Sequence, residues 1–265
     1  MNFTLFRYSC KRSFLLWLVF TVLMSLYAFA VVRMYDPVAG AALVSLTESL
    51  PQAMNILGMA NYADTFTAFV VNYLYGMLML ALPMVFTIIL SVQVMAHHVS
   101  SGTMSYLLAS PNSRRRIAAT QRNVLIFNLF LMLAVCCIAT IALCEFFYPG
   151  KLAIQPFLLL TVCIFALQLA FAGMCYFFSC KCNSTVGALI INAAACILFY
   201  TIRLLSNIGG PLTYLRYATP YTLIDPAGIL QGDLHACLLP LILLLIAILL
   251  FTLASRSFQK KTMPF

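Results

Sequence analysis

Six apolar runs, each long enough to cross a lipid bilayer, constrain this chain more than any other feature. They cover about residues 14–32, 66–94, 124–147, 156–178, 185–205 and 234–254. A hydrocarbon core about 30 Å thick needs roughly 20 helical residues at about 1.5 Å each. Only 8% of the residues are charged, against about a quarter in soluble domains, so the chain cannot cover itself with a water-facing surface. We therefore expect an all-α integral membrane protein with six transmembrane helices, forming a single transmembrane domain over residues 1–265.

The basic residues predict how these spans are oriented. Eleven of the fifteen basic residues fall on the side of the expected membrane that also holds both chain ends: Arg7, Lys11, Arg12, Arg114, Arg115, Arg116, Arg122, Lys181, Arg256, Lys260 and Lys261. The six acidic residues fall on or near the other side. Because short cytoplasmic segments carry an excess of Lys and Arg, we expect both termini in the cytoplasm. The expected location is the plasma membrane of a bacterial cell, crossed several times.

The segments around the spans predict further helical features. Residues 1–13 mix apolar and basic side chains, which is typical of an interfacial helix lying flat before the first span. The long outer segment 33–65 is expected to hold a short helix on the outer surface. Prolines and paired glycines in residues 206–233 exclude one continuous helix, so short outer helices are expected before the last span. Pro83 is expected to kink the second span, and neighbouring helices must accommodate that kink.

The most polar segment lies between the second and third spans, over about residues 96–123. It contains a very short predicted helix, which Pro111 ends. This helix carries an apolar ridge formed by Met104, Tyr106, Leu107 and Leu108. Asn112 or Ser113 is then expected to cap the helix that leads into the third span. An isolated helix this short is marginal in water, so we expect it to dock into the groove of a partner protein. A loop folded against the chain's own spans is the alternative.

Basic residues flank this segment and precede the first span. They are expected to anchor the chain to lipid phosphates at the membrane surface: Arg7, Lys11, Arg12, Arg114, Arg115, Arg116 and Arg122. Membrane lipid is therefore an expected partner. Nucleic acid is not, although the net charge is +9, because the basic residues lie in short segments between apolar runs and form no groove-binding module.

The sequence lacks the motifs of common enzymes. It contains no H-E-x-x-H and no G-x-S-x-G, so no catalytic residue is expected. Without a G-x-x-x-x-G-K-[ST] phosphate loop, the chain is not expected to bind ATP by itself, and no cofactor is expected in it. His97 and His98 would point about 100° apart on a helix, so they could not easily chelate one metal ion together. Because Cys180 and Cys182 form only a lone C-x-C, no metal site is expected.

The spans hold few ionisable side chains but several uncharged polar ones. Those that could line a transport pathway are Asn72, Asn128, Gln168, Asn192 and Arg203. Such groups also form hydrogen bonds between helices in membrane bundles, and both interpretations stay open. An ion-coupled carrier usually places ionisable residues at the membrane midplane, and these are scarce here.

Two segments resemble a known family. "SSGTMSYLLASPNSRRRIAATQ" resembles the cytoplasmic signature of permease subunits of type-2 ATP-binding-cassette (ABC) transporters. The matching residues are Gly102, Thr103, Leu107, Leu108, Pro111, Ser113 and Arg114. "YLRYATPYTLIDPAGILQGD" is similar to the family's outer stretch before the last span, through Tyr217, Pro220, Tyr221 and Gly232. The family usually carries acidic residues just before the Gly-Thr pair, where this chain has His97, His98, Ser100 and Ser101.

The resemblance implies a membrane-spanning exporter subunit that forms the translocation path. It implies a coupling helix that contacts a cytoplasmic ATPase subunit, within residues 101–116, with Gly102, Thr103, Met104, Tyr106, Leu107, Leu108 and Pro111 at the contact. ATP and Mg²⁺ are then expected only on that partner, and a second permease subunit, identical or related, completes the assembly. The aromatic and Met content suits an amphipathic cargo such as a peptide or a drug. The alternatives are an ion-coupled secondary transporter or channel without an ATPase, a membrane-embedded enzyme, and a structural or sensory membrane partner.

Overall fold

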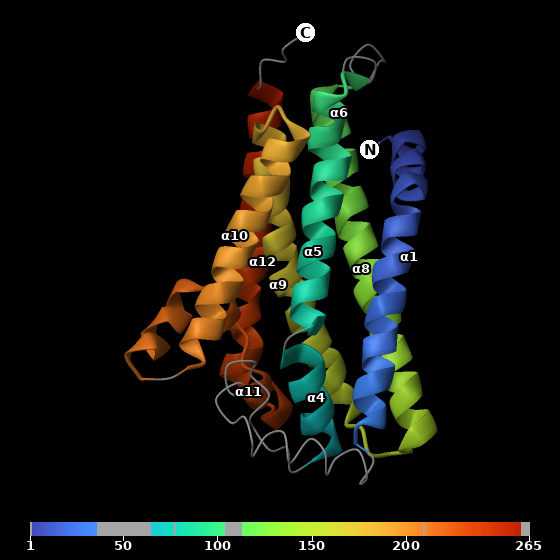
Figure 1. The fold of residues 1–265 in the computed structure, drawn as a ribbon, viewed down its shortest axis with the longest axis vertical. Helices are drawn as coiled ribbons and strands as arrows, with labels where there is room; N and C mark the ends of the chain where they lie inside the picture. The colour runs from blue at the N-terminus through green and yellow to red at the C-terminus, as the bar shows by residue number, and fades with distance from the viewer. Residues whose placement is uncertain (1, 36–64, 77, 104–112, 209, 261–265) are drawn as a thin grey trace.

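The computed structural model describes residues 2–35, 65–76, 78–103, 113–208 and 210–260. These residues form an all-helical bundle without a strand (Figure 1). Six of the helices are long and apolar enough to cross a membrane, so the chain is a multi-pass membrane protein. The expected short helix within residues 33–65 lies outside the described residues.

The six spans of the bundle agree with the apolar runs. They are α1 (Phe3–Arg33), the composite span of α4 (Phe66–Gly76), α5 (Leu78–Ser91), the π-helix η1 (Val92–Ala96) and α6 (His97–Ser100), then α8 (Arg114–Phe147), α9 (Ile154–Lys181), α10 (Thr185–Ser206) and α12 (Leu234–Lys260). The short helices expected before the last span are confirmed: η2 (Gly210–Ala218), η3 (Pro220–Leu223) and α11 (Pro226–Gln231).

The separate interfacial helix expected over residues 1–13 is wrong. Asn2 caps the first helix by accepting a hydrogen bond from the Leu5 N–H at 3.2 Å, and α1 then continues unbroken into the span. The segment contains no Pro or Gly that would end a helix. It packs along α8 instead of lying flat, and the Asn2 N–H donates to Thr120 Oγ1 at 3.0 Å.

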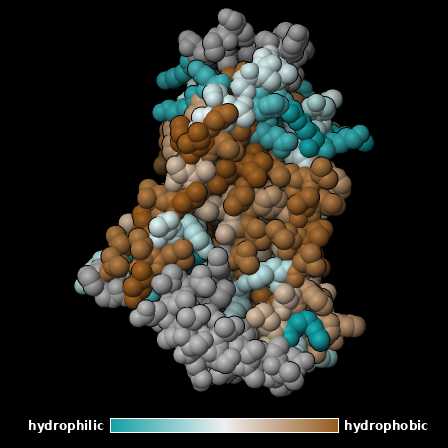
Figure 2. Space-filling view, in the orientation of Figure 1, coloured by the Kyte–Doolittle hydropathy of each residue, from teal (hydrophilic) through white to brown (hydrophobic). Residues whose placement is uncertain are grey.

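Both chain ends and α6 lie at the same end of the bundle (Figure 1). Hydrophilic side chains gather there, and a broad hydrophobic band follows (Figure 2). We call this the basic end and define it by its described basic residues: Arg7, Lys11, Arg12, Arg114, Arg115, Arg116, Arg122, Lys181, Arg256 and Lys260. The turns after α1, α8 and α10 lie at the opposite end.

Helix α9 forms the centre of the bundle, with contacts to α5, α8, α10 and α12. It approaches α12 closely at Gly173, where an added Cβ would lie 3.1 Å from the Cβ of Leu250 and 3.3 Å from the carbonyl oxygen of Ala247. A larger residue would push the two helices apart, so glycine sets their spacing.

The backbone around Pro83 receives a hydrogen bond from a neighbouring helix. A proline inside a helix removes one backbone donor and disturbs the carbonyl groups of the preceding turn. Gln168 of α9 donates from Nε2 to the carbonyl of Leu80 at 2.9 Å. This side chain is fully buried. The neighbouring helix α9 therefore contributes a hydrogen bond to the turn that precedes the proline, and the kink itself stays a prediction.

The outer helices of the bundle bury little of their surface within the chain. The most apolar windows of α1, α10 and α12 are only 28%, 17% and 28% buried, against 61% for α9. The remaining surface is rich in exposed Leu, Ile, Val and Phe (Figure 2). Lipid or another protein must cover it.

Candidate functional site

The segment with the coupling signature begins from a sharp turn at the basic end. Ser101 closes α6, with its N–H donating to the carbonyl of His97 at 3.0 Å. Gly102 follows in the left-handed region at φ 70°. An added Cβ would meet no atom within 4 Å there, so the requirement for glycine is conformational and not steric.

Thr103 is held by three hydrogen bonds after this turn. Its Oγ1 lies 3.0 Å from Nδ1 of His98 and 2.9 Å from Oγ of Ser101, and it donates to the carbonyl of His98 at 3.3 Å. The histidine side chain is buried although it lies at the end of the span. His98 and Ser101, just before the Gly-Thr pair, therefore hold Thr103 at the start of the segment.

Both flanks of the segment connect to other spans. Ser100 forms a hydrogen bond with Thr185, at the start of α10. On the far flank, Ser113 accepts the N–H of Arg116 at 3.3 Å and caps α8, which confirms the predicted cap. Helix α6 continues to Ser100 and α8 begins at Arg114, so both ends of the predicted loop 96–123 are helical. The remaining predicted contact residues lie outside the described residues: Met104, Tyr106, Leu107, Leu108 and Pro111.

The predicted lipid anchors differ in their exposure at the basic end. Five are exposed: Arg7, Lys11, Arg12, Arg115 and Arg116. Arg114 and Arg122 are partly buried, and Nε of Arg122 donates to Oδ1 of Asn123 at 3.2 Å. The three described acidic residues lie at the opposite end, so cations dominate the surface around the coupling segment.

A buried polar cluster lies on the membrane side of this segment. Asn192 of α10 donates from Nδ2 to Ser179 Oγ of α9 at 3.0 Å and to Ser91 Oγ of α5 at 3.3 Å. All three side chains are fully buried. The π-helix η1 follows Ser91 directly and leads to the histidine pair. The polar cluster thus joins three spans where the second one departs from α-helical geometry.

Two of the other predicted pathway residues are also enclosed between helices. Asn128 accepts a hydrogen bond from Ser13 of α1 at 3.4 Å and donates to its own helix at Val124. Gln168 supports the backbone before Pro83, as described above. Asn72 is half-buried in α4. In this chain the amides of Asn128, Gln168 and Asn192 tie helices together, and a role in lining a pathway remains a prediction.

Arg203, the fifth predicted pathway residue, has different surroundings at the opposite end. Its guanidinium carbon lies 5.0 Å from the ring centroid of Tyr221 in η3. Its Nη1 atom is enclosed and has no hydrogen-bond partner among the described residues. One turn earlier on α10, the hydroxyl of Tyr200 is also enclosed without a partner within the described part of the chain.

Tyr221 connects these two side chains to the core. Its ring lies 6.3 Å from the ring of Tyr200 and 5.3 Å from that of Phe171 in α9. The pKa of Tyr221 lies above its usual value because the effect of burial, which raises it, outweighs that of the nearby Arg203 cation, which lowers it. The phenol therefore stays neutral at physiological pH and offers the cation a ring face and no counter-charge.

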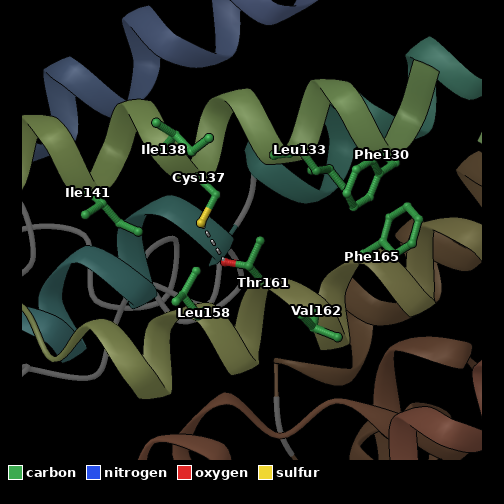
Figure 3. A pocket seen from close by; sticks show the side chains of 10 residues that line it. Phe130, Leu133, Cys137, Ile138, Ile141, Leu158, Thr161, Val162 and Phe165 are labelled. Atoms are coloured by element: carbon green, nitrogen blue, oxygen red, sulfur yellow. Dashed lines mark hydrogen bonds between the residues drawn. The ribbon is translucent and has the colours of Figure 1, made fainter. Parts of the chain in front are cut away.

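A groove opens between α8 and α9 in the membrane-spanning part (Figure 3). It has a volume of about 240 Å³ and is lined by Phe130, Leu133, Ala134, Cys137, Ile138, Ile141, Leu158, Thr161, Val162 and Phe165. The only hydroxyl in this lining belongs to Thr161, and it is already bonded to Tyr75 and to the carbonyl of Phe157. The groove therefore presents hydrocarbon and no free polar group.

The described residues contain no cluster of three or more His, Cys, Asp or Glu side chains that could hold a metal ion. The ring centroids of His97 and His98 lie 6.2 Å apart at an angle of 48°. Cys180 is buried in α9, whereas Cys182 follows the helix end. Neither pair is joined by a third ligand among the described residues.

Sequence reasoning missed three features of these sites. The π-helix has no distinct residue pattern. Ser91 and Ser179 look like ordinary small residues in their spans, and only their pairing with Asn192 makes them notable. Tyr200 carried a usable signal, because it precedes Arg203 by three residues and shares its helix face.

Comparisons with known proteins do not identify a family. No model of a protein family matches the chain, and no curated protein is significantly similar to it.

Proposed function

We propose that the chain is the membrane-spanning permease subunit of an ATP-driven ABC exporter. In this proposal a separate cytoplasmic ATPase subunit holds ATP and Mg²⁺, and the coupling helix within residues 101–116 contacts that subunit. The basic end faces the cytoplasm, in agreement with the positive-inside rule. The membrane is the plasma membrane of a bacterial cell.

One observation carries the proposal: the signature segment is mounted at the basic end between two structured flanks. Gly102 and Thr103 fix its start, and the Ser113 cap fixes its end. A short helix held at both ends can transmit force, whereas a free loop cannot. This mounting supports a contact helix more than a loop folded against its own spans.

The neighbouring contacts supply a route from this segment into the membrane. Ser100 is tied to the start of α10, and Ser91 and Asn192 join the same two spans deeper in the bundle. A shift of the coupling segment would therefore bias the relation between these spans. Reciprocal linkage then requires that the state of the spans also biases the nucleotide state of the ATPase.

A second permease subunit, identical or related, completes the proposed exporter. The uncovered apolar faces of α1, α10 and α12 offer it a surface, and lipid covers the rest. The cargo in this proposal is an amphipathic compound, such as an antimicrobial peptide or a drug.

The test is co-expression of the chain with the ABC ATPase encoded beside it, followed by assays of ATP hydrolysis and export in inverted vesicles. Replacing Leu107→Asp and Leu108→Asp together puts charge on the proposed contact. We expect it to abolish export and return ATP hydrolysis to the rate of the ATPase alone, with unchanged membrane abundance. The matched control is Leu107→Ile with Leu108→Met, which keeps an apolar contact of similar volume and should retain most of the activity.

Normal assembly and export by the double Asp variant would exclude the coupling contact. Export driven by an ion gradient without any ATPase would favour the secondary transporter instead.

A further inference from the structure

Two unpartnered hydrogen-bond donors lie one turn apart on α10 at the opposite end. Nη1 of Arg203 and the hydroxyl of Tyr200 are both enclosed, and neither has a partner among the described residues. Residues at positions i and i+3 share a helix face, so both donors serve one location. Enclosed donors without an acceptor are unfavourable, and their coincidence on one face indicates an acceptor that the described chain does not supply.

The aromatic wall around these donors holds the guanidinium without neutralising it. Tyr221 stacks under Arg203 at 5.0 Å and also contacts the ring of Tyr200. Its own hydroxyl is directed to Sδ of Met84 at 3.6 Å. The ring thus orients the cation, while its hydroxyl is engaged elsewhere.

The described carboxylates are engaged elsewhere as well. Glu145 accepts the N–H of Gly150 at 3.2 Å. Asp225 and Asp233 accept the N–H groups of Ala227 and His235, each at 3.2 Å. These contacts are local caps and turns, and no described acid is hydrogen-bonded to Arg203.

The position of Arg203 favours a ligand from the membrane surface. It lies in the last turn of α10, where the helix dipole also favours a cation but supplies no acceptor to Nη1. Its side chain as a whole is only partly buried, so a ligand can approach the guanidinium, although neighbouring atoms must move to open the enclosed Nη1 atom. A guanidinium and a phenol hydroxyl together match an oxyanion.

We propose that Arg203 and Tyr200 form a binding site for the oxyanion of an anionic amphiphile. The phosphate or carboxylate accepts from both donors, and the hydrocarbon part lies against the apolar surface of α10. The source of the amphiphile is either the bilayer or a freely diffusing compound. The site does not depend on ATPase coupling, so its failure would leave the proposed exporter function untouched.

The experiment measures equilibrium binding of radiolabelled dodecyl phosphate to the full chain in nanodiscs of phosphatidylcholine. We expect saturable binding that dodecanol does not compete for. Arg203→Gln should weaken it about tenfold or more, and Tyr200→Phe, which keeps the ring, about fivefold. The matched control is Arg216→Gln, because Arg216 also stacks on a ring, that of the exposed Tyr217, at 5.6 Å. It should change the affinity less than about twofold.

Melting curves of each variant in the same nanodiscs test whether the variant keeps the fold. Adding phosphatidylglycerol to the discs separates the two sources. If it competes with dodecyl phosphate in the wild type, the ligand is a lipid headgroup, and if it does not, the ligand is a diffusing amphiphile. Absent binding, equal binding by folded Arg203→Gln, or equal loss in Arg216→Gln would overturn the site.

Discussion

The two ends of the bundle handle positive charge in different ways. At the opposite end, each of the four basic residues lies over an aromatic ring: Arg33 on Phe147, Lys151 on Tyr35 and Tyr148, Arg203 on Tyr221, and Arg216 on Tyr217. At the basic end, only Lys181 among the described basic residues has such a ring, that of Phe177. The chain thus gives each cation of the opposite end a ring of its own, whereas most of the described cations of the basic end have no such ring.

Because of this difference, the cations of the basic end act together, whereas each cation of the opposite end acts through its own contact. Each cation near an anionic membrane surface contributes about 1 kcal/mol to membrane binding, and salt screens this contribution. The effect of the basic end is therefore the sum of many small contributions. A stacked cation is worth about 0.5–2 kcal/mol, depending on how far it is desolvated. The cations of the opposite end therefore have effects that depend on the particular residue.

Charge reversal at the basic end should have the largest effect. Replacing Arg114, Arg115 and Arg116 together by Glu removes three cations and repels anionic lipid, which amounts to roughly 3 kcal/mol or more. We expect a large fraction of the chains to insert with the wrong orientation or not at all. Protease accessibility of the loop in spheroplasts and inverted vesicles measures this. The control, Arg216→Glu at the opposite end, should leave orientation unchanged, and a triple variant with normal orientation would refute the role of the basic end.

A smaller effect is expected at the turn that mounts the coupling segment. Gly102→Ala forces a Cβ into the left-handed region at a cost of about 1–2 kcal/mol. The turn should relax, and ATP hydrolysis should become partly uncoupled from export while membrane abundance stays the same. Gly187→Ala in α10 is the control, because a Cβ there meets only an ordinary contact at 3.5 Å to Ser184 Oγ. Equal coupling in the two variants would show that the turn does not position the segment.

Removing the enclosed cation Arg203 should stabilise the folded protein, whereas the other changes impair it. In neutral detergent without an oxyanion, Arg203→Met removes an unpartnered donor but also a stacking contact. The net change is a stabilisation of roughly 1 kcal/mol. Chemical denaturation with a fluorescence readout measures it. A clear destabilisation would mean that Arg203 is already satisfied in the free protein.

The smallest effect is expected for an ordinary stacked cation. Arg33→Gln loses the contact with Phe147 at 5.2 Å and should destabilise the chain by about 0.5–1 kcal/mol. The same denaturation assay compares it with Arg203→Met. Stabilisation by Arg203→Met together with destabilisation by Arg33→Gln would support the distinction between an enclosed, unpartnered cation and an ordinary stacked one. A stability change of the same sign in both variants would contradict that distinction.

Much of the fold could be predicted because hydrophobicity is a local property. The six apolar runs became the six spans. The Ser113 cap also depends only on neighbouring residues. The errors at the helix ends have a physical reason: helix continues beyond the hydrocarbon region through charged residues. Thus α1 begins at Phe3, without a separate helix before the span.

The sites were less predictable because they combine distant residues. Tyr200 and Arg203 meet Tyr221 only through the fold of the segment after α10. Asn192 finds Ser91 across 101 positions. The proposed coupling segment, by contrast, has a continuous motif, and the Ser113 cap on its far flank could be assigned from the sequence alone.

The most direct test of the central claim is site-specific photocrosslinking in native membranes. A photoreactive phenylalanine at Leu108 should form an adduct with an ABC ATPase subunit, identified by mass spectrometry. The same probe at Tyr217, exposed at the opposite end, should form none. An ATPase adduct at position 108 alone is the predicted result. No ATPase adduct at position 108, or equal adducts at both positions, would contradict the exporter account.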